Sequence, residues 1–502
     1  MIVNLYVLVC YLIKNLFNTK SRLVSTETFH AHLALLFVSC YFPCFIEMFF
    51  GISTTVLTVL IADLLATAGD ITQTWTSPMY IKLYSNDTSE NPLGKPLTSS
   101  EDSWIGSLIN IGAVIGAIPT GFIADKIGRK NVMLAIAVPH MIAYFTYAFA
   151  NHVYLFYIGR FINGIALGAG YTILPMYMTE ITEDSNRASL SVTLNIFWTL
   201  GNFIPYAIGP YLSVRTFNLI LAAIPTTFLL CFVIIGSETP HFLVQTGQIA
   251  EAEETVMRLR SCSKEKAKKE VEVLEAAFKK HDDVSLKDIF MNRGLRKAYI
   301  VSLILIFLQT MSGIGAISYY MQPIFAASGS NFSASVSTTI CGACMFLSSF
   351  TTTFIVESAG KKWPLGVSCL GDALSLAVLG AFFYIKDSTS LSTDHISWLP
   401  IAGLLGYIFF FNLAYSALPW TISSELFPSN VKPISSASVA ACCWMTSFFV
   451  TKFFNVSNEI LGRAGTFWIY SGACLFAVLF DIIWVPETRG KNFSEIQEML
   501  QK

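Results

Sequence analysis

Acidic and basic side chains recur at matching places in the two halves of the sequence. The segment 125–130 reads DKIGRK and the segment 357–362 reads ESAGKK, and in two further segments a glutamate precedes a cation by seven residues. Opposite charges placed in this way can form reversible ion pairs, each worth about 1 kcal/mol or less when exposed. The repetition predicts a charged latch between two similar halves, made by Asp125, Arg129, Lys130, Glu180 and Arg187 in the first half and by Glu357, Lys361, Lys362, Glu425 and Lys432 in the second.

Long apolar stretches surround these charges. Of the 502 residues, 54% are hydrophobic and 13% are charged, whereas soluble domains average about 25% charged residues. Because about 20 apolar residues cross the hydrocarbon core of a bilayer as a helix, the sequence predicts an all-α membrane protein with twelve transmembrane helices. The predicted spans are 55–78, 104–124, 131–150, 153–178, 188–212, 215–236, 297–327, 335–357, 363–386, 396–424, 433–456 and 464–485.

The spans fall into two groups of six, separated by a polar segment. In that segment lysines and glutamates alternate, and Val256, Leu259, Val271 and Leu274 recur at three-to-four spacing, which indicates short amphipathic helices in water. A charge run of this kind is usually a solvated face, and latching the two halves together on one side of the membrane is a second role for it. The predicted domains are a six-helix bundle at 55–236, a cytoplasmic helical linker at 237–296, a second six-helix bundle at 297–485 and a cytoplasmic tail at 486–502.

Lysine and arginine follow every even-numbered span, which predicts that these span ends are cytoplasmic. Setting the topology is also the alternative explanation for the charged residues of the predicted latch. The loop 79–103 then faces outward, and it carries a glycosylation sequon at Asn86. The expected location is the plasma membrane, in a multi-pass arrangement. Basic and acidic residues are nearly balanced, 32 against 33, so no nucleic acid is expected as a partner.

The first 54 residues do not fit the twelve-span scheme. Residues 2–17 and 31–54 are also apolar, with Lys14, Lys20 and Arg22 among and between them. This N-terminal extension is an additional span, a helix lying on the membrane surface or an artefact of the gene model. We favour the last interpretation, because the twelve-span count is complete without it.

The sequence resembles the sugar-porter branch of the major facilitator superfamily across nearly all of residues 55–502. Besides the repeated charged segments, the matching motifs are Gly159-Arg160 with Gly164 and Gly168, Ser237-Glu238-Thr239-Pro240, Gln309 to Tyr320, and Pro486-Glu487-Thr488-Arg489-Gly490. The region from Trp75 to Ser107 looks most like the insect facilitated trehalose transporters. The resemblance implies two pseudo-symmetric six-helix bundles and alternating access to a central sugar site. It also adds Arg160, Glu238 and Glu487 to the predicted latch.

The resemblance implies sugar-binding side chains inside the spans. Gln309, Trp420 and Asn195 match polar or aromatic positions of the family's pocket, and Thr310 and Asn412 are further candidates. Amides bond sugar hydroxyls and an aromatic ring covers the apolar sugar face, although packing between helices is the alternative role of each. Several family amides are missing, and Thr310, Gly315, Met345, Cys443 and Ser447 stand in their places. Each loss removes bonds worth about 0.5–1.5 kcal/mol.

Glycine and proline mark an expected gate. Gly313 precedes Tyr319 and Tyr320, so the seventh span is expected to break and bend over the pocket, and Pro419 weakens the tenth span. Asp70 in the first span is a possible proton site, offset by one position from the acid of proton-linked relatives. Facilitated diffusion of trehalose or a hexose is therefore favoured over proton symport, and a sugar sensor that does not transport is a third alternative. No enzyme motif, metal site or cofactor is expected.

Overall fold

The computed structural model describes residues 53–278, 291–330, 332–350, 360–427, 431–488, 491, 495 and 499–500. The chain divides into Met1–Thr54 and Thr55–Lys502, and the description below concerns the second unit. The predicted N-terminal extension lies outside the described residues except for its last two. Glu357 and the side chains of Arg187 and Lys432 also lie outside them.

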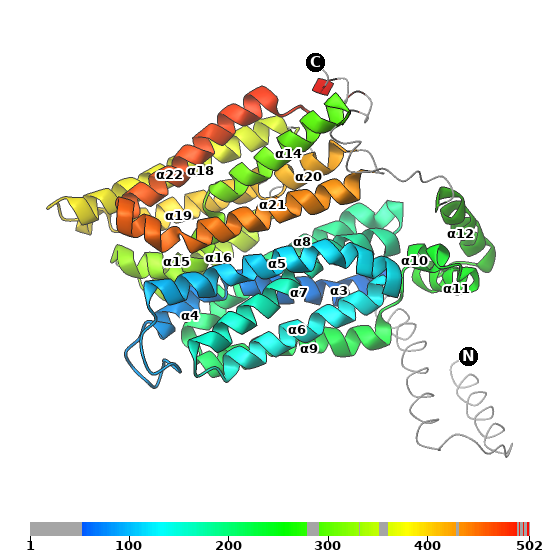
Figure 1. Cartoon of the computed structure of the whole chain (residues 1–502), viewed down its shortest axis with the longest axis horizontal. Helices are drawn as coiled ribbons and strands as arrows, with labels where there is room; N and C mark the ends of the chain where they lie inside the picture. Colours follow the sequence, from blue (N-terminus) through cyan, green and yellow to red (C-terminus); the bar gives the residue numbers. More distant parts are fainter. Residues whose placement is uncertain are drawn as a thin grey trace, which may run out of the picture. The chain divides into compact units, whose positions relative to one another are not determined.

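The regular elements of the described residues are helices (Figure 1). Those of the first half are α3 (Thr54–Thr74), α4 (Thr76–Leu83), α5 (Ser99–Ile127), α6 (Arg129–Ala148), α7 (Val153–Ile181), α8 (Asp184–Ile208), the 3-10 turn η1 (Gly209–Tyr211) and α9 (Val214–Ile235). Those of the linker are α10 (Pro240–Gln245), α11 (Ile249–Arg260) and α12 (Lys264–Phe278). Those of the second half are α14 (Arg293–Met311), α15 (Ile314–Ser328), α16 (Ala334–Ser348), α18 (Lys362–Ser388), η2 (Asp394–Ile396), α19 (Leu399–Phe410), the π-helix η3 (Phe411–Tyr415), α20 (Leu418–Glu425), α21 (Lys432–Lys452) and α22 (Phe454–Trp484).

Nine helical segments of the described residues are long and apolar enough to cross a membrane. In this count α14 with α15 forms one segment, Arg293–Ser328, and η2 to α20 forms another, Asp394–Glu425. The predicted spans outside the count correspond to α8, α16 and α21. Of these, α16 is apolar but short, whereas α8 and α21 carry more polar side chains.

Glycines set the closest helix packing in the first half, between α5 and α7. A Cβ atom on Gly116 would lie 2.0 Å from the carbonyl oxygen of Ile165, and one on Gly168 would lie 2.0 Å from that of Ala113. Only glycine allows backbones to approach so closely. Gly170, in contrast, has open space where its Cβ would be, so it does not share this role.

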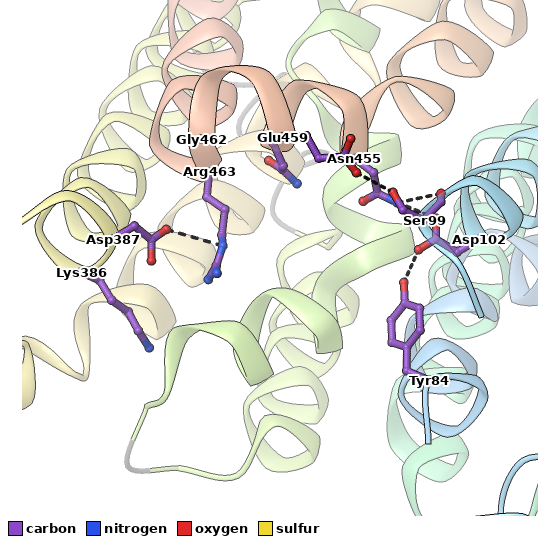
Figure 2. A pocket seen from close by; sticks show the side chains of 10 residues that line it. Tyr84, Ser99, Asp102, Lys386, Asp387, Asn455, Glu459, Gly462 and Arg463 are labelled. Atoms are coloured by element: carbon purple, nitrogen blue, oxygen red, sulfur yellow. Dashed lines mark hydrogen bonds and ion pairs between the residues drawn. The ribbon is translucent and has the colours of Figure 1, made fainter. Parts of the chain in front are cut away.

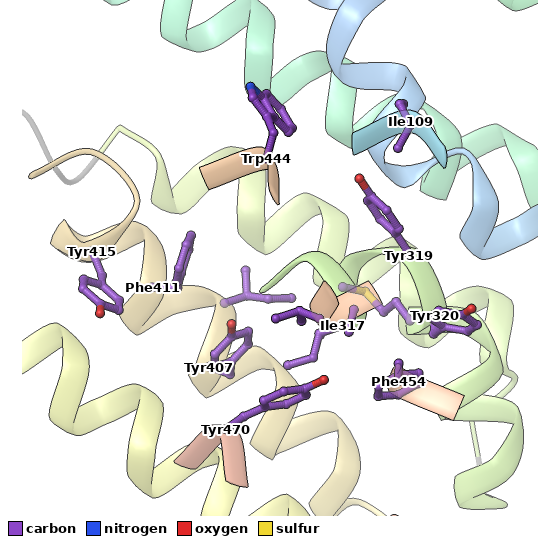
Figure 3. Close-up of a cluster of buried hydrophobic side chains, with 14 of the residues drawn as sticks. Ile109, Ile317, Tyr319, Tyr320, Tyr407, Phe411, Tyr415, Trp444, Phe454 and Tyr470 are labelled. Carbon is purple, nitrogen blue, oxygen red and sulfur yellow. The ribbon is translucent and has the colours of Figure 1, made fainter. Parts of the chain in front are cut away.

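Among the described residues, the two halves meet mainly along three helix pairs, α5 with α21, α8 with α16, and α4 with α15 (Figure 1). Figure 3 shows part of the buried core, where Tyr319 of α15 lies near Ile109 of α5 and Tyr320 lies near Phe454 of α22. Tyr320 packs on Phe454, with ring centroids 4.8 Å apart. The buried core therefore continues from one half into the other.

The linker helices form a small core of their own, built from Leu243, Val244, Ala252, Val256, Ala267 and Val271. The hydroxyl of Thr55 donates to the carbonyl oxygen of Leu259 at 2.6 Å, and Arg260 forms an ion pair of 3.4 Å with Glu183. These contacts join the linker to the first half.

Candidate functional site

A cavity of about 480 Å³ lies between the two halves. Helices α3, α5, α7 and α8 line it from one side, and α14, α15, η3, α20 and α21 line it from the other, with Met345 and Ser349 at α16. The three predicted spans that are too polar or too short for the membrane criterion all contribute to this lining. The polarity of α8 and α21 is explained by this position, because side chains that face a cavity avoid the lipid.

All five predicted sugar-binding residues line this one cavity: Asn195, Gln309, Thr310, Asn412 and Trp420. Asn195 is exposed and Trp420 is 37% exposed, whereas the other three are buried. The residues that stand in place of the family's amides, Gly315, Met345, Cys443 and Ser447, line the same cavity. These four residues bring no amide to the cavity wall.

Gln309 supports a break in the helix opposite it. Its Nε2 donates to the carbonyl oxygens of Tyr415, at 2.6 Å, and Ser416, at 3.0 Å. In a continuous helix the carbonyl of Tyr415 would pair with the backbone N–H four residues on, but that residue is Pro419, which has none. Gln309 supplies the missing donor. Because both amide hydrogens are used, a sugar hydroxyl can bond only the side-chain carbonyl of Gln309.

The sequence did not reveal a polar network around Asp70. The Asp70 carboxylate accepts bonds from Tyr171 Oη at 2.7 Å, Asn202 Nδ2 at 2.7 Å and Gln73 Nε2 at 3.3 Å. Asp70, the possible proton site of the first span, lies in the cavity wall with 2% exposure. One signal was available, because Asn202 follows Asn195 by two helical turns and so lies on the same face of α8.

Aromatic rings form part of the cavity wall. Tyr171 stacks on Trp198, with centroids 5.1 Å apart and planes inclined by 10°. Trp444 meets Tyr171 edge-on at 5.5 Å, and Trp420 adds a further ring to the lining. Amides and hydroxyls beside flat aromatic surfaces can bind a ring that has hydroxyls at its edge and an apolar face.

The cavity is closed at the end where α4 meets α15. Thr76 Oγ1 donates to the carbonyl oxygen of Tyr319 at 3.1 Å, the backbone N–H of Gln322 donates to Ser77 Oγ at 2.9 Å, and Tyr80 stacks on Tyr320 at 4.9 Å. Both predicted gate tyrosines are thus buried between the halves, with 1% and 2% exposure.

The seventh span breaks where the glycines predicted it. Gly313 has φ +86°, a left-handed conformation, and it separates α14 from α15. A Cβ atom there would lie 2.4 Å from the ring of Tyr470, so both conformation and space require glycine. Tyr320 also departs from helical geometry, with φ −112° and ψ 15°.

Asp102 lies at the centre of a second set of contacts at this closed end, farther from the cavity. It accepts hydrogen bonds from Tyr84 of the first half and from Asn455 of the second (Figure 2). Tyr320, also of the second half, donates a further bond to it. Nearby, Lys452 Nζ donates to Ser103 Oγ at 2.9 Å and lies 3.8 Å from the ring centroid of Trp104. Figure 2 also shows the pair of Arg463 and Asp387, 3.5 Å apart, in the adjoining cavity of about 830 Å³.

At the other end of the helices, the repeated charged segments form similar structures in the two halves. The backbone N–H groups of Arg129 and Lys130 donate to Glu238 at 2.9–3.2 Å, and those of Lys361 and Lys362 donate to Glu487 at 3.1–3.3 Å. The preceding residues, Gly128 and Gly360, both have positive φ, +92° and +80°. Each glutamate therefore caps the start of a helix, α6 or α18, where carboxylates are stabilised.

The ion pairs of these segments stay within one half. Arg129 binds Glu180 at 2.9 Å and Asp125 at 3.1 Å, and Lys361 binds Glu425. Burial raises the pKa of the Glu238 carboxyl, and the bonds from backbone N–H groups act in the opposite direction. Among the described side chains, each ion pair of the latch residues thus joins two residues of the same half.

Arg160 was wrongly assigned to this latch. On α7 it lies twenty residues before Glu180, about 30 Å away along the helix. Its guanidinium, 0% exposed, donates to the carbonyl oxygens of Ile105 at 2.8 Å and of Thr72. It lies 5.7 Å from the ring centroid of Tyr319. Arg160 belongs to the closed end of the cavity. The motif that places it beside Gly159 does not show how deep in the membrane its side chain lies.

A comparison of this sequence with models of known protein families identifies its family. The sequence model described as "Sugar (and other) transporter" matches residues 29–500. The chain belongs to this sugar transporter family. The match begins within the N-terminal extension, and membership of a transporter family confirms the prediction that the chain is not an enzyme.

Relatives in this sugar transporter family include insect proteins named facilitated trehalose transporter Tret1. The protein of Culex quinquefasciatus is 29% identical over 433 residues, covering 85% of this chain and 82% of that protein. The protein of Apis mellifera ligustica is 30% identical over 430 residues, covering 84% and 83%. The protein of Aedes aegypti is 29% identical over 454 residues, covering 89% of this chain and 55% of that protein. The chain thus spans little more than half the length of some relatives that it matches.

The fold of this sugar transporter family member is similar to that of the xylose transporter XylE from E. coli in an inward open conformation. The TM-score is 0.70 at 19% identity, and the match covers 88% of this chain and 98% of that one. A structure of the same major facilitator superfamily protein bound to 6-bromo-6-deoxy-D-glucose gives 0.65 at 21% identity, covering 89% of this chain and all of that one, 100%. The predicted all-helical membrane fold is confirmed.

Proposed function

We propose that this protein carries a small sugar across a membrane by alternating access, using two bundles of six transmembrane helices. The observation that carries the proposal is the cavity between the halves, lined by amides, hydroxyls and aromatic rings and closed at one end by residues of both halves. Such a cavity suits a ligand with many hydroxyls. The predicted plasma-membrane location and the cytoplasmic linker belong to the same proposal.

In this proposal, the closed end of the cavity is the outer end. Loop 79–103, with Asn86 exposed, lies on the side of the closed end, and the positive-inside rule places that side outward. In the opposite conformation, we propose, the charged segments at the cytoplasmic end approach and bridge the halves. Asp125, Glu180 and Glu425 would then exchange partners with the cations of the other half.

Trehalose or a hexose is the proposed substrate, moved by facilitated diffusion. The insect relatives support this choice through their name, facilitated trehalose transporter. A proton symporter is the second candidate, and the observation in its favour is Asp70, a carboxylate in the cavity wall. Symport predicts faster uptake at acidic external pH, because the driving proton is more abundant there, whereas facilitated diffusion does not require that increase.

The test is uptake of labelled trehalose, glucose and fructose by cells that express the full chain, at two external pH values. We expect saturable uptake of at least one sugar without a pH requirement. Binding without uptake would identify a sensor and overturn the transport proposal. An Asp70→Asn variant separates the two coupling modes, since a symporter would lose accumulation against a gradient, and surface labelling checks that each variant reaches the membrane.

A further inference from the structure

A second kind of cavity lies on the outside of the second half, at the start of α14 and the end of α22. Its volume is about 490 Å³, and it shares no lining residue with the central cavity. One part of its wall is basic and the other is apolar and aromatic. The lining comprises Arg293, Arg296, Lys297, Ile300, Val301, Ile304, Phe476, Phe480 and Trp484.

The basic part leads directly into exposed apolar surface. Arg293 and Arg296 are exposed, and Ile300, one helical turn after Arg296, is 48% exposed. On α22, Phe476 is 53% exposed and Trp484 is 47% exposed. Both helices are counted among the membrane-crossing segments, so these apolar surfaces face hydrocarbon. This cavity, called the groove below, therefore has cations at one end and apolar side chains along the rest of its wall.

The position along the membrane follows from a contact to the charged cluster. Lys362 Nζ donates to the carbonyl oxygen of Ile482 at 2.7 Å, which places the end of α22 beside the segment 361–362. That segment marks the predicted cytoplasmic end. Trp484 stacks on Phe480 at 5.5 Å and lies at the level where tryptophan favours the membrane interface. The cytoplasmic leaflet is the one rich in anionic lipids, which basic clusters attract.

We propose that this groove binds an anionic phospholipid. The phosphate lies between Arg293, Arg296 and Lys297, and an acyl chain lies along Ile300, Phe476 and Phe480. A free phosphate would use only the basic part, and a zwitterionic lipid would gain less from three cations. The site is independent of the sugar cavity, so it stands or falls separately from the proposed transport.

The experiment measures lipid bound to the purified full chain by native mass spectrometry. The protein is delipidated in detergent and then exposed to phosphatidylserine, phosphatidylinositol or phosphatidylcholine at equal concentration. The test variant is Arg293→Gln/Arg296→Gln/Lys297→Gln. The matched control is Lys264→Gln/Lys266→Gln/Lys269→Gln, which removes three exposed lysines from α12. A third arm adds inorganic phosphate in place of lipid and follows the melting temperature.

We expect an anionic lipid to bind wild type and the α12 control alike, and to bind the groove variant at least about tenfold more weakly. Equal binding by the groove variant, equal loss in the control, or equal binding of phosphatidylcholine would overturn the proposal. A melting shift caused by inorganic phosphate and lost in the groove variant would also overturn it, in favour of free phosphate. If the triple variant does not fold, Arg296→Gln alone is measured in the same way and must show weaker anionic binding.

Discussion

The phenol of Tyr320 donates a hydrogen bond of 3.3 Å to the carboxylate of Asp102, joining α15 of the second half to α5 of the first. Tyr84 and Asn455 donate to the same carboxylate from opposite halves. A carboxylate can accept several such bonds at once, so this one side chain of α5 connects the two halves at the closed outer end. Opening the cavity on that side requires these bonds to be exchanged for bonds to water.

Tyr320→Phe removes one of these bonds and retains the ring that stacks on Tyr80. A hydrogen bond to a charged group contributes about 1.5–3 kcal/mol, so the fraction of molecules open at the outer end should rise by about tenfold or more. Distances between spin labels on the outer ends of α5 and α22, in a variant whose reactive cysteines are replaced, measure this fraction. Tyr211→Phe, at a tyrosine that is 64% exposed, is the control. Unchanged distances in Tyr320→Phe would show that this bond does not hold the closure.

Hydropathy and charge predicted the helices and their grouping because both are properties of segments. An uninterrupted apolar stretch has only a helix in which to satisfy its backbone in lipid. The position of the break at Gly313 also followed from the sequence, since glycine weakens a helix locally through its backbone freedom. The expected cavity positions of Gln309 and Trp420 depended on the family resemblance.

Side-chain partners were less accessible to sequence analysis, because they depend on how helices rotate and pack. Tyr171, Trp198 and Trp444 read as ordinary aromatic residues of apolar spans, yet they share one wall of the cavity. Gln309 was expected to bond sugar, whereas its amide hydrogens are taken by the break at Pro419. Arg160 was misplaced for the same reason, since a motif does not give the depth of a side chain in the membrane.

The relationship between Gln309 and Pro419 predicts a coupled effect on stability. Gln309→Ala leaves the carbonyl of Tyr415 without its donor, which costs about 1–3 kcal/mol. Pro419→Ala restores a backbone N–H four residues after Tyr415, so the double variant should recover part of that loss. Melting temperatures of the wild type, both single variants and the double variant give the coupling. Strictly additive effects would show that the two residues do not serve the same carbonyl.

The packing of α5 against α7 predicts a contrast between two glycines of α7. Gly168→Ala places a methyl group 2.0 Å from the carbonyl oxygen of Ala113, whereas Gly170→Ala places it in open space. Overpacking of this kind costs about 1–3 kcal/mol, so Gly168→Ala should melt at a lower temperature. Gly170→Ala should match or exceed the wild type, because alanine favours a helix over glycine. A similar loss in both variants would show that helix packing is not the cause.

The two charged clusters at the cytoplasmic end should differ in strength although their backbone geometry matches. The side chain of Arg129 is 6% exposed and meets two carboxylates, whereas Glu425, the partner of Lys361, is 35% exposed. Arg129→Gln should therefore destabilise the protein by about 3 kcal/mol, since it leaves Glu180 buried without its cation. Lys361→Gln should cost about 1 kcal/mol or less, because solvent reaches the half-buried Glu425 and screens the pair.

Thermal melting of both variants at low and high salt measures this difference. Screening should weaken the Lys361 pair in the wild type and so shrink the effect of Lys361→Gln at high salt, while the effect of Arg129→Gln should persist. If the two substitutions cost the same and respond equally to salt, the burial of Arg129 contributes nothing. The first half would then gain no more rigidity than the second from its charged segment, and the asymmetry between the clusters would have no energetic consequence.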